Sequence, residues 1–228
     1  MSFVSVQNNA QSRLNENLQF LNFITTQEPT DPQDATPLEV NVMKGLFYVH
    51  LYASFEKTIN ELIEQTIILI DSKAIKVRHF NESFHTVALV DKLKSFKNCS
   101  HKSFFSKAHE ILYETSAVNV VTLSETTFSN SLQNVWFETI VEISKCFGIS
   151  AIPITPRIRT TINELVEKRN AVAHGREKAS DVGSRFRTNI LRMKMNEISN
   201  FIYSLIALYD NYYTRKNYLK TGSKRLYP

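Results

Sequence analysis

The sequence predicts a nearly all-α protein, on the evidence of its composition and its hydrophobic spacing. Only five of the 228 residues are glycine and six are proline, so many long stretches hold neither of the residues that interrupt helices. Hydrophobic residues make up 43% of the chain, which supports a sizeable core and excludes a disordered chain. We therefore expect one globular helical domain over residues 1–228.

Two long helices are expected in the first third of the chain. The first covers residues 5–25 and ends before a polar loop that contains two prolines. The second opens at Pro37 and extends to about Ser72. Its hydrophobic residues recur every seven positions, at Val42, Val49, Ile63 and Ile70. The missing member of this series is Glu56, which is either exposed or a buried partner for a cation on another helix.

Residues 73–130 are interpreted as a helical insertion. The segments 84–96 and 103–114 have the pattern of two short helices, and a joint rich in Ser, Asn and His separates them. The β-branched residues at 118–123 favour an extended backbone there. The pattern in this region is less regular than in the long helices that flank it.

Two further helices are expected around residue 150. One covers residues 131–147 and ends at Gly148, and the other begins at Thr155 with Pro156 in its first turn. The hydrophobic residues of the second follow a helical repeat, at Ile158, Ile162, Leu165, Val166, Val172 and Ala173.

The last long helix is expected to follow a polar turn at residues 176–181 and to extend to about Tyr218. Its hydrophobic residues keep the spacing of three and four that helix packing requires. They are Ile198, Phe201, Ile202, Leu205, Leu208, Tyr209 and Tyr212. We interpret them as core residues. The basic tail at residues 219–228 is expected to fray.

The segment 169–175, Arg-Asn-Ala-Val-Ala-His-Gly, holds polar residues that packing does not explain. Arg169 falls at the centre of the hydrophobic stripe of the helix that ends here. Asn170 and His174 flank that stripe one helical turn apart, so their side chains can meet on one face. We expect the guanidinium, the amide and the imidazole to converge at this helix end.

Positive charge is concentrated in the same part of the chain. Residues 1–156 carry 12 basic and 16 acidic side chains, a net charge of −4, whereas residues 157–228 carry 15 and 6, a net charge of +9. A basic segment around a candidate site is typical of proteins that bind a polyanion, and RNA or DNA is the commonest such partner. The alternative is a solvated helix face that acidic neighbours balance.

Several functional classes lack support in the sequence. The six histidines form no His-Glu-x-x-His pair, and Cys99 and Cys146 are too few for a four-cysteine site, so we expect no metal and no cofactor. No glycine-rich phosphate loop, dinucleotide fingerprint or Gly-x-Ser-x-Gly sequence is present. Without a disulfide framework, a leader pattern or a membrane-spanning hydrophobic run, we expect a cytoplasmic protein that is not bound to a membrane.

In its helical setting, segment 169–175 resembles the Arg-Asn-x-x-Ala-His-Gly form of the HEPN motif. The helices around it resemble the MAE-type and RiboL-PSP-associated branches of that superfamily. The resemblance implies an up-and-down helical bundle, often dimerised so that two motifs face each other. It also implies a metal-independent endoribonuclease of toxin–antitoxin, phage-defence or RNA-processing systems, or a relative that has lost activity. Toxins silenced by tyrosine modification carry a Tyr two positions after the His, where this chain has Arg176, which argues against that kind of antitoxin.

The resemblance places the catalytic roles on Arg169, Asn170 and His174. Cleavage of RNA by its own 2′-hydroxyl needs proton transfer near neutral pH and stabilisation of extra negative charge on the phosphate. The imidazole of His174 suits the first need, and the planar guanidinium of Arg169 suits the second. Asn170 can position His174 or a phosphate oxygen, and Glu56 is the expected partner that positions Arg169. Nearby basic residues are expected to bind the RNA backbone, namely Arg176, Lys178 and Arg185.

Three functions remain open on the sequence alone. The first is a homodimeric endoribonuclease that cuts single-stranded RNA in one basic cleft. The second is a non-catalytic HEPN module that binds RNA or a protein partner, such as an antitoxin or a defence-system protein. The third is a structural adaptor, expected if the basic segment faces acidic helices. In a structural role, Arg169 would pair with Glu56 or Glu167, and His174 would cap the carbonyls at its helix end.

Overall fold

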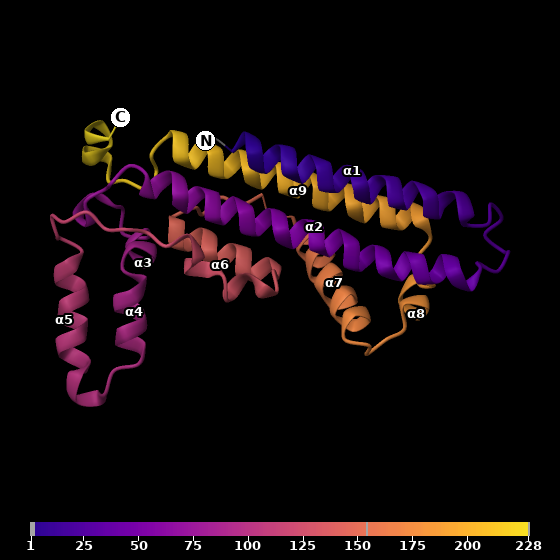
Figure 1. Cartoon of the computed structure of the whole chain (residues 1–228), viewed down its shortest axis with the longest axis horizontal. Coiled ribbons are helices and arrows are strands. Elements are labelled where there is room, and N and C mark those ends of the chain that lie inside the picture. The colour runs from indigo at the N-terminus through magenta and orange to yellow at the C-terminus, as the bar shows by residue number, and fades with distance from the viewer. Residues whose placement is uncertain (1–2, 154, 228) are drawn as a thin grey trace.

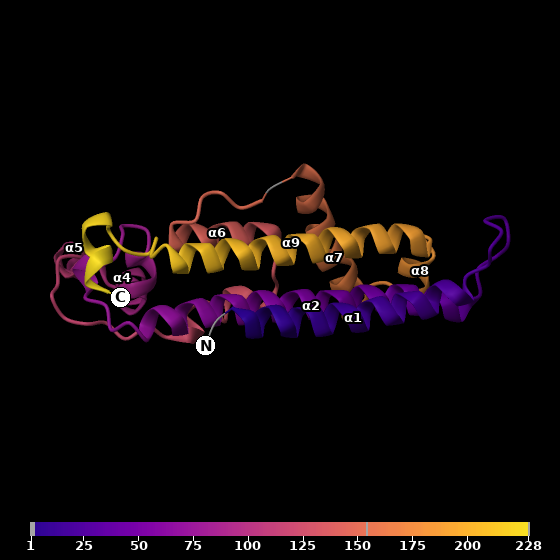
Figure 2. The same cartoon turned by 90° about the horizontal axis from the view of Figure 1, so that it is seen from above.

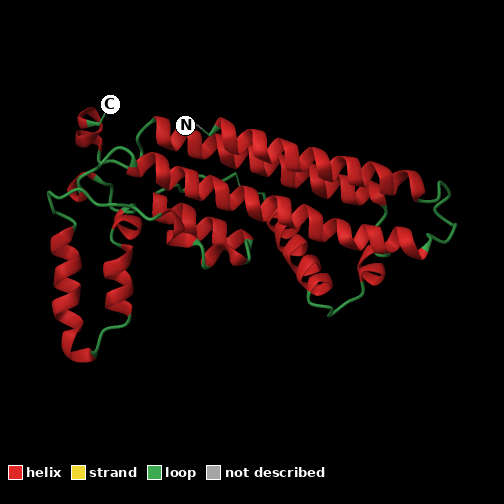
Figure 3. Ribbon diagram, in the orientation of Figure 1, coloured by secondary structure: helices red, strands yellow, loops and turns green. Residues whose placement is uncertain are grey.

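The structure is a computed structural model that describes residues 3–153 and 155–227. Within those ranges the chain is helical, with two isolated β-bridges and no strand, as Figure 3 shows. The expected all-α class is therefore confirmed.

Three long helices give the molecule its length (Figures 1 and 2). They are α1 (Val4–Gln27), α2 (Leu38–Asp71) and α9 (Thr188–Thr214). α1 runs antiparallel to α2, whereas α9 runs in the same direction as α2. The three helices all contact one another, and α7 (Pro156–Ala173) contacts both α2 and α9 from outside this group of three. The two long helices expected in the first third of the chain are confirmed.

α2 is the central helix, because it contacts α1, α7, α9 and the short helix α8 described below. Within its seven-residue hydrophobic series, Ile63 and Ile70 are buried, while Val42 and Val49 are half-buried. A seven-residue spacing drifts around an α-helix that has 3.6 residues per turn. One such series therefore cannot follow one buried face along the 34 residues of α2.

A short helix that the sequence pattern did not predict, α8 (Ala179–Gly183), packs against α2 and separates α7 from α9. This contact depends on two glycines. A Cβ on Gly45 would lie 2.0 Å from the carbonyl oxygen of Ala179, and a Cβ on Gly183 would lie 1.9 Å from the carbonyl oxygen of Asn41. Since neither backbone leaves space for a side chain, both glycines are required for this close approach.

Buried charges connect the start of α9 to the loop after α1. Glu28 is 5% exposed at its side chain, and its Oε1 accepts a hydrogen bond at 3.1 Å from Lys44 Nζ, which is 2% exposed. Its Oε2 accepts from the backbone N and from Oγ1 of Thr188, at 3.0 and 2.7 Å. The carboxylate thus lies at the N-terminus of α9, where negative charge is favoured. Burial acts to raise the pKa of Glu28, but the hydrogen bonds from Thr188 and Lys44 outweigh burial and leave the pKa below its ordinary value.

Residues 73–130 lie largely outside the layer of long helices. α4 (Val90–Lys97) and α5 (Phe104–Glu114) form a hairpin that projects from one end of the bundle (Figure 1). The helix expected at 84–96 is instead split into α3 (His85–Ala88) and α4, because the backbone leaves helical geometry at Leu89. The segment 118–123, expected to be extended, forms an isolated antiparallel bridge between Val120 and Lys76 and no strand. The interpretation of this segment as an insertion stays a prediction.

The helix expected over residues 131–147 begins later than predicted. A single 3₁₀ turn, Ser131–Gln133, comes first, and α6 covers Phe137–Phe147. Gly148 ends α6 with a left-handed φ of 83°, as the sequence predicts.

The C-terminal tail is held against the chain rather than frayed. α9 ends at Thr214, so the helix expected to reach Tyr218 is too long. Beyond it, Thr221–Leu226 forms a 3₁₀ helix. The backbone N of Lys220 donates to the carbonyl of His79 at 2.9 Å, and the Tyr227 hydroxyl lies 2.7 Å from His79 Nδ1. Contacts with a segment about 140 residues earlier order this tail, and no local pattern reveals them.

Candidate functional site

α7, which carries the candidate site, begins and ends as its sequence predicts. The Thr155 side chain caps its N-terminus by accepting a hydrogen bond from a backbone N of the first turn at 3.1 Å. α7 ends at Ala173, and Gly175 takes a left-handed φ of 66°. This turn lets the backbone N of Arg176 donate to the carbonyl of Ala171 at 2.9 Å. The motif therefore occupies a closed, well-defined helix end.

Arg169 is surrounded by polar groups from three parts of the chain. Its Nη1 donates to Asn170 Oδ1 at 2.7 Å and to Asn134 Oδ1 at 3.3 Å. Its Nη2 lies 3.7 Å from Glu56 Oε2, and the two side chains are 22% and 23% exposed. The structure thus brings Glu56 to Arg169, while Glu167 makes no ion pair with it. That Glu56 positions Arg169 for a reaction stays a prediction.

Tyr52 lies beneath the guanidinium and was not identified from the sequence. The Cζ of Arg169 is 4.4 Å from the centre of the Tyr52 ring. The Tyr52 hydroxyl donates to Glu56 Oε1 at 2.9 Å and accepts from the backbone N of Val135 at 2.9 Å. Burial is the main factor that raises the pKa of Tyr52, to about 12, so the hydroxyl stays protonated at neutral pH. The available sequence signal was the spacing of Tyr52 and Glu56, one helical turn apart.

His174 is exposed and does not join the other two motif side chains. It is the residue that follows the last turn of α7, and its backbone N donates to the carbonyl of Asn170 at 3.1 Å. No hydrogen bond or ion pair of its imidazole occurs in residues 3–153 and 155–227. The expected convergence therefore holds for Arg169 and Asn170, and His174 remains available to a ligand or to a second chain.

Unpaired positive charge lies in the last turns of α7 and in the turn that follows it. Lys168, Arg176 and Lys178 have no side-chain partner within the described part of the chain, and Arg176 and Lys178 are exposed. Arg185 instead forms an ion pair with Glu177. Of the three basic residues expected to bind an RNA backbone, two are free and one is engaged.

Part of the basic segment is neutralised by acidic residues of the first 156 positions. Arg159 pairs with Glu138, and Arg187 lies 3.6 Å from Glu28. These pairs are what a structural adaptor would show. The free cations beside the motif are not explained by that role, because they form no ion pair in the ranges described.

A surface pocket of about 460 Å³ adjoins the motif. It lies between the C-terminal part of α7, the turn that follows, and the residue before α6. Its lining residues are Trp136, Glu167, Lys168, Asn170, Ala171, Arg176 and Glu177. The pocket thus combines an aromatic side chain, two cations and the motif amide.

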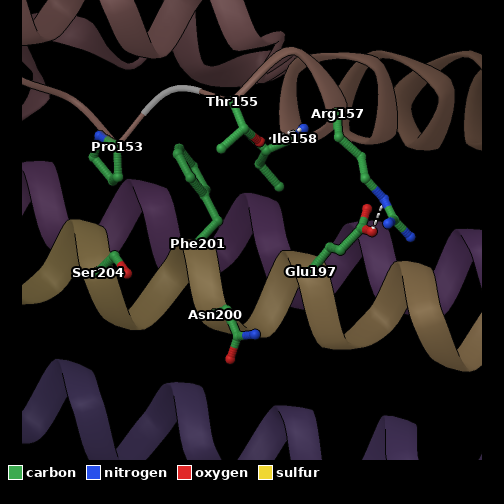
Figure 4. A pocket seen from close by; sticks show the side chains of 8 residues that line it. All are labelled: Pro153, Thr155, Arg157, Ile158, Glu197, Asn200, Phe201 and Ser204. Atoms are coloured by element: carbon green, nitrogen blue, oxygen red, sulfur yellow. Dashed lines mark hydrogen bonds and ion pairs between the residues drawn. The ribbon is translucent and has the colours of Figure 1, made fainter.

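A second pocket, of about 220 Å³, lies at the opposite end of α7 (Figure 4). Pro153, Ile158 and Phe201 supply its hydrophobic surface, and Arg157 and Glu197 form an ion pair at its edge. No motif residue lines it, so the candidate chemistry does not involve this pocket.

The described residues hold no group of three or more His, Cys, Asp or Glu side chains arranged to bind a metal ion. Likewise, no helix in the part of the chain that the structure describes is long and apolar enough to span a bilayer.

Comparison with known families identifies the family of this chain. The model of the RiboL-PSP-HEPN family matches residues 8–215, which is most of the chain and includes the motif. The chain belongs to the RiboL-PSP-HEPN family. Membership confirms the HEPN resemblance and identifies a HEPN module of the nucleotide- and RNA-related kind. No curated protein and no solved structure gave a significant match. The matched range also includes residues 73–130, to which the resemblance seen in the helices around the motif did not extend.

Proposed function

We propose that this RiboL-PSP-HEPN protein is a metal-independent endoribonuclease that cuts single-stranded RNA. The observation that supports it best is that the two motif side chains Arg169 and His174 are held differently at the end of α7. Arg169 is oriented by Asn170, Glu56 and the Tyr52 ring, whereas His174 is exposed and unengaged. A fixed cation and an accessible imidazole are the two groups that cleavage by an internal hydroxyl requires.

The reaction follows from these two groups. The 2′-hydroxyl oxygen of a ribose attacks the adjacent phosphorus, and the bond from phosphorus to the 5′-oxygen of the next nucleotide breaks. Arg169 stabilises the additional negative charge on the phosphate oxygens. His174 transfers a proton, either from the attacking hydroxyl or to the departing 5′-oxygen. The products are a 2′,3′-cyclic phosphate and a free 5′-hydroxyl, so the step consumes no water.

A homodimer would bring together groups that one chain keeps apart. Within the described part of one chain, the imidazole of His174 makes no hydrogen bond with Arg169 or Asn170. Two copies related by a two-fold axis can place His174 of each chain near Arg169 of the other. The free cations Lys168, Arg176 and Lys178 would then border one shared cleft. Such a nuclease would act in a toxin, phage-defence or RNA-processing role, with an antitoxin or defence protein as a further partner.

The test uses purified protein, single-stranded RNA and EDTA. We expect the wild type to produce fragments with cyclic phosphate ends, and Arg169→Ala and His174→Ala to be slower by about 10²-fold or more, because each removes a group acting at the transition state. Arg192→Ala is the matched control. Arg192 also lies in the basic part of the chain, residues 157–228, but it contacts Asn22 instead of the motif. Cleavage only in the presence of magnesium would contradict the mechanism.

The second candidate is a non-catalytic HEPN module that binds RNA or a protein. The observation in its favour is that Arg169 already donates to the amide oxygens of Asn170 and Asn134 and pairs with Glu56, and these partners compete with a phosphate. Absence of cleavage by the wild type, with unchanged RNA affinity in both motif variants, would favour this candidate.

A further inference from the structure

The pocket beside the motif has the size and lining of a nucleotide site. Its volume of about 460 Å³ lies within the range of about 300–1,000 Å³ that small-molecule sites occupy. It shares Asn170 with the motif, so its occupant would adjoin the group bound by Arg169.

Trp136 gives this pocket a rigid aromatic surface. It is partly exposed and lines the pocket, while Val135 and Phe137 on either side of it are 0% and 4% exposed. The backbone N of Val135 also donates to the Tyr52 hydroxyl at 2.9 Å. The indole packs partly against the core, and the backbone on both sides of it is anchored by buried residues, one of which is hydrogen-bonded to Tyr52 beneath Arg169. A fixed aromatic ring beside a cationic surface is what unpaired bases stack on.

The charges of the pocket distinguish a nucleotide from a simple anion. Lys168 and Arg176 line it and have no side-chain partner in the described ranges. Glu167 and Glu177 line it as well, and Glu177 forms an ion pair with Arg185. Two carboxylates oppose a bare phosphate or polyphosphate inside the pocket. They do not oppose a neutral base whose phosphate remains outside, near the two cations.

We propose that this pocket binds one unpaired base of an RNA strand, stacked on Trp136, with its phosphate near Lys168 and Arg176. This inference rests on the proposed function, because the strand is the one whose adjacent phosphate Arg169 binds. It adds a base subsite to a motif that by itself contacts only the RNA backbone. Single-stranded RNA is then preferred over a duplex, because only an unpaired base can leave its stack to enter the pocket.

Trp136 is the only tryptophan of the chain, so its fluorescence reports on this pocket alone. The titration uses His174→Ala, in which we expect cleavage to be slow, with a ten-nucleotide oligoadenylate. The matched ligand is a ten-unit abasic ribose phosphate chain of equal charge. We expect saturable quenching by the oligoadenylate and little by the abasic chain. Equal quenching by both would overturn the proposal, since the phosphates alone would then account for it.

A second measurement does not depend on fluorescence. Trp136→Leu should weaken oligoadenylate affinity about tenfold, measured by anisotropy of a labelled RNA, because one base-stacking contact is lost. Trp136→Phe should lose less, because it keeps an aromatic ring. Phe105→Leu is the control, since Phe105 is an aromatic residue of α5 that is 79% exposed and lies outside the pocket.

These experiments separate the two proposals. Cleavage in EDTA combined with wild-type affinity in Trp136→Leu would overturn the base subsite and leave the nuclease intact. Quenching by oligoadenylate without cleavage by the wild type would overturn the nuclease and support the subsite as part of an RNA-binding module. Circular dichroism of each variant verifies that the helices are retained.

Discussion

At Arg169, one guanidinium makes two hydrogen bonds, an ion pair and a contact with an aromatic ring. The ion pair to Glu56 is 3.7 Å long, its side chains are 22% and 23% exposed, and pairs that solvent reaches contribute about 0–1 kcal/mol. The Tyr52 ring at 4.4 Å adds a cation–π contact of about 0.5–1 kcal/mol. Each contact alone is weak, so the orientation of Arg169 depends on their combination.

The first prediction concerns Glu56 as a positioning residue. Glu56→Gln keeps an oxygen that can accept from the Tyr52 hydroxyl but removes the charge that attracts Arg169. We expect kcat for RNA cleavage to fall about tenfold with little change in KM, because orientation at the transition state is lost while RNA binding is retained.

Glu61→Gln is the matched control for this variant. Glu61 also lies on α2 and pairs with an arginine, Arg13 of α1, but has no contact with the motif. It should leave kcat unchanged. An increase in activity in Glu56→Gln would show instead that Glu56 blocks the phosphate site.

The sequence pointed to the contact between Arg169 and Glu56. Arg169 stood out because it interrupts a hydrophobic stripe, and Glu56 because it interrupts a seven-residue series. Tyr52 was missed because it is fully buried and has the position of an ordinary core residue. Asn134 was missed because it lies in a loop, and only the three-dimensional path of that loop brings it to Arg169.

At the scale of elements, the site depends on how α8 attaches the end of α7 to the bundle. α8 follows the motif turn directly and packs on α2 through Gly45 and Gly183. The backbone of the turn is therefore fixed at both ends, by the helix end at Gly175 on one side and by α8 on the other.

The second prediction tests this attachment with Gly45→Ala. In an isolated helix, alanine would be more favourable than glycine by about 1 kcal/mol. In this protein the new Cβ would lie 2.0 Å from the Ala179 carbonyl oxygen, so α8 must move away. We expect a net loss of about 1–3 kcal/mol in the free energy of unfolding, the range for overpacking, measured by urea denaturation.

The control for the glycine prediction is Gly222→Ala, because a Cβ at Gly222 meets no atom within 4 Å. It should unfold at the same urea concentration as the wild type. If Gly45→Ala were as stable as the wild type, the close contact between α2 and α8 would not exist in solution.

The sequence predicted the long helices better than the short ones for a physical reason. A long amphipathic helix shows several turns of its period, whereas α8 has five residues and only one of them, Val182, is a buried hydrophobic side chain with a partner helix. The same limit applies to α3 and α4, because no Gly or Pro marks the break between them at Leu89.

For the whole molecule, the buried Lys44–Glu28 pair connects α2, the loop after α1 and α9. The lowered pKa of Glu28 gives the third prediction, which concerns how the free energy of unfolding depends on pH. Because the folded pKa of Glu28 lies below its ordinary value of 4.5, the stabilisation is present above that value and is lost as the pH falls through the folded pKa. The contribution should therefore be constant from neutral pH to about pH 5 and decrease in more acidic solution.

Glu28→Gln isolates this contribution from that of other carboxylates. At pH 7 we expect the variant to be less stable by about 3 kcal/mol, because it leaves the buried Lys44 charge uncompensated. The difference from the wild type should shrink at pH 4. Urea denaturation at both pH values measures it, and a difference independent of pH would contradict the assigned role of the charge.

The last prediction concerns the assembly of two copies. If Arg169 of one chain acts with His174 of the other, a heterodimer of Arg169→Ala and His174→Ala retains one complete site and one that lacks both groups. The heterodimer, purified through two different tags, should then have about half the wild-type activity in EDTA, although each variant alone is slower by about 10²-fold or more. If both groups of a site came from the same chain, each site of the heterodimer would lack one group, and the mixture would be as inactive as its parents. The chains are identical except at the two substituted positions, so this contrast depends only on which chain supplies the imidazole.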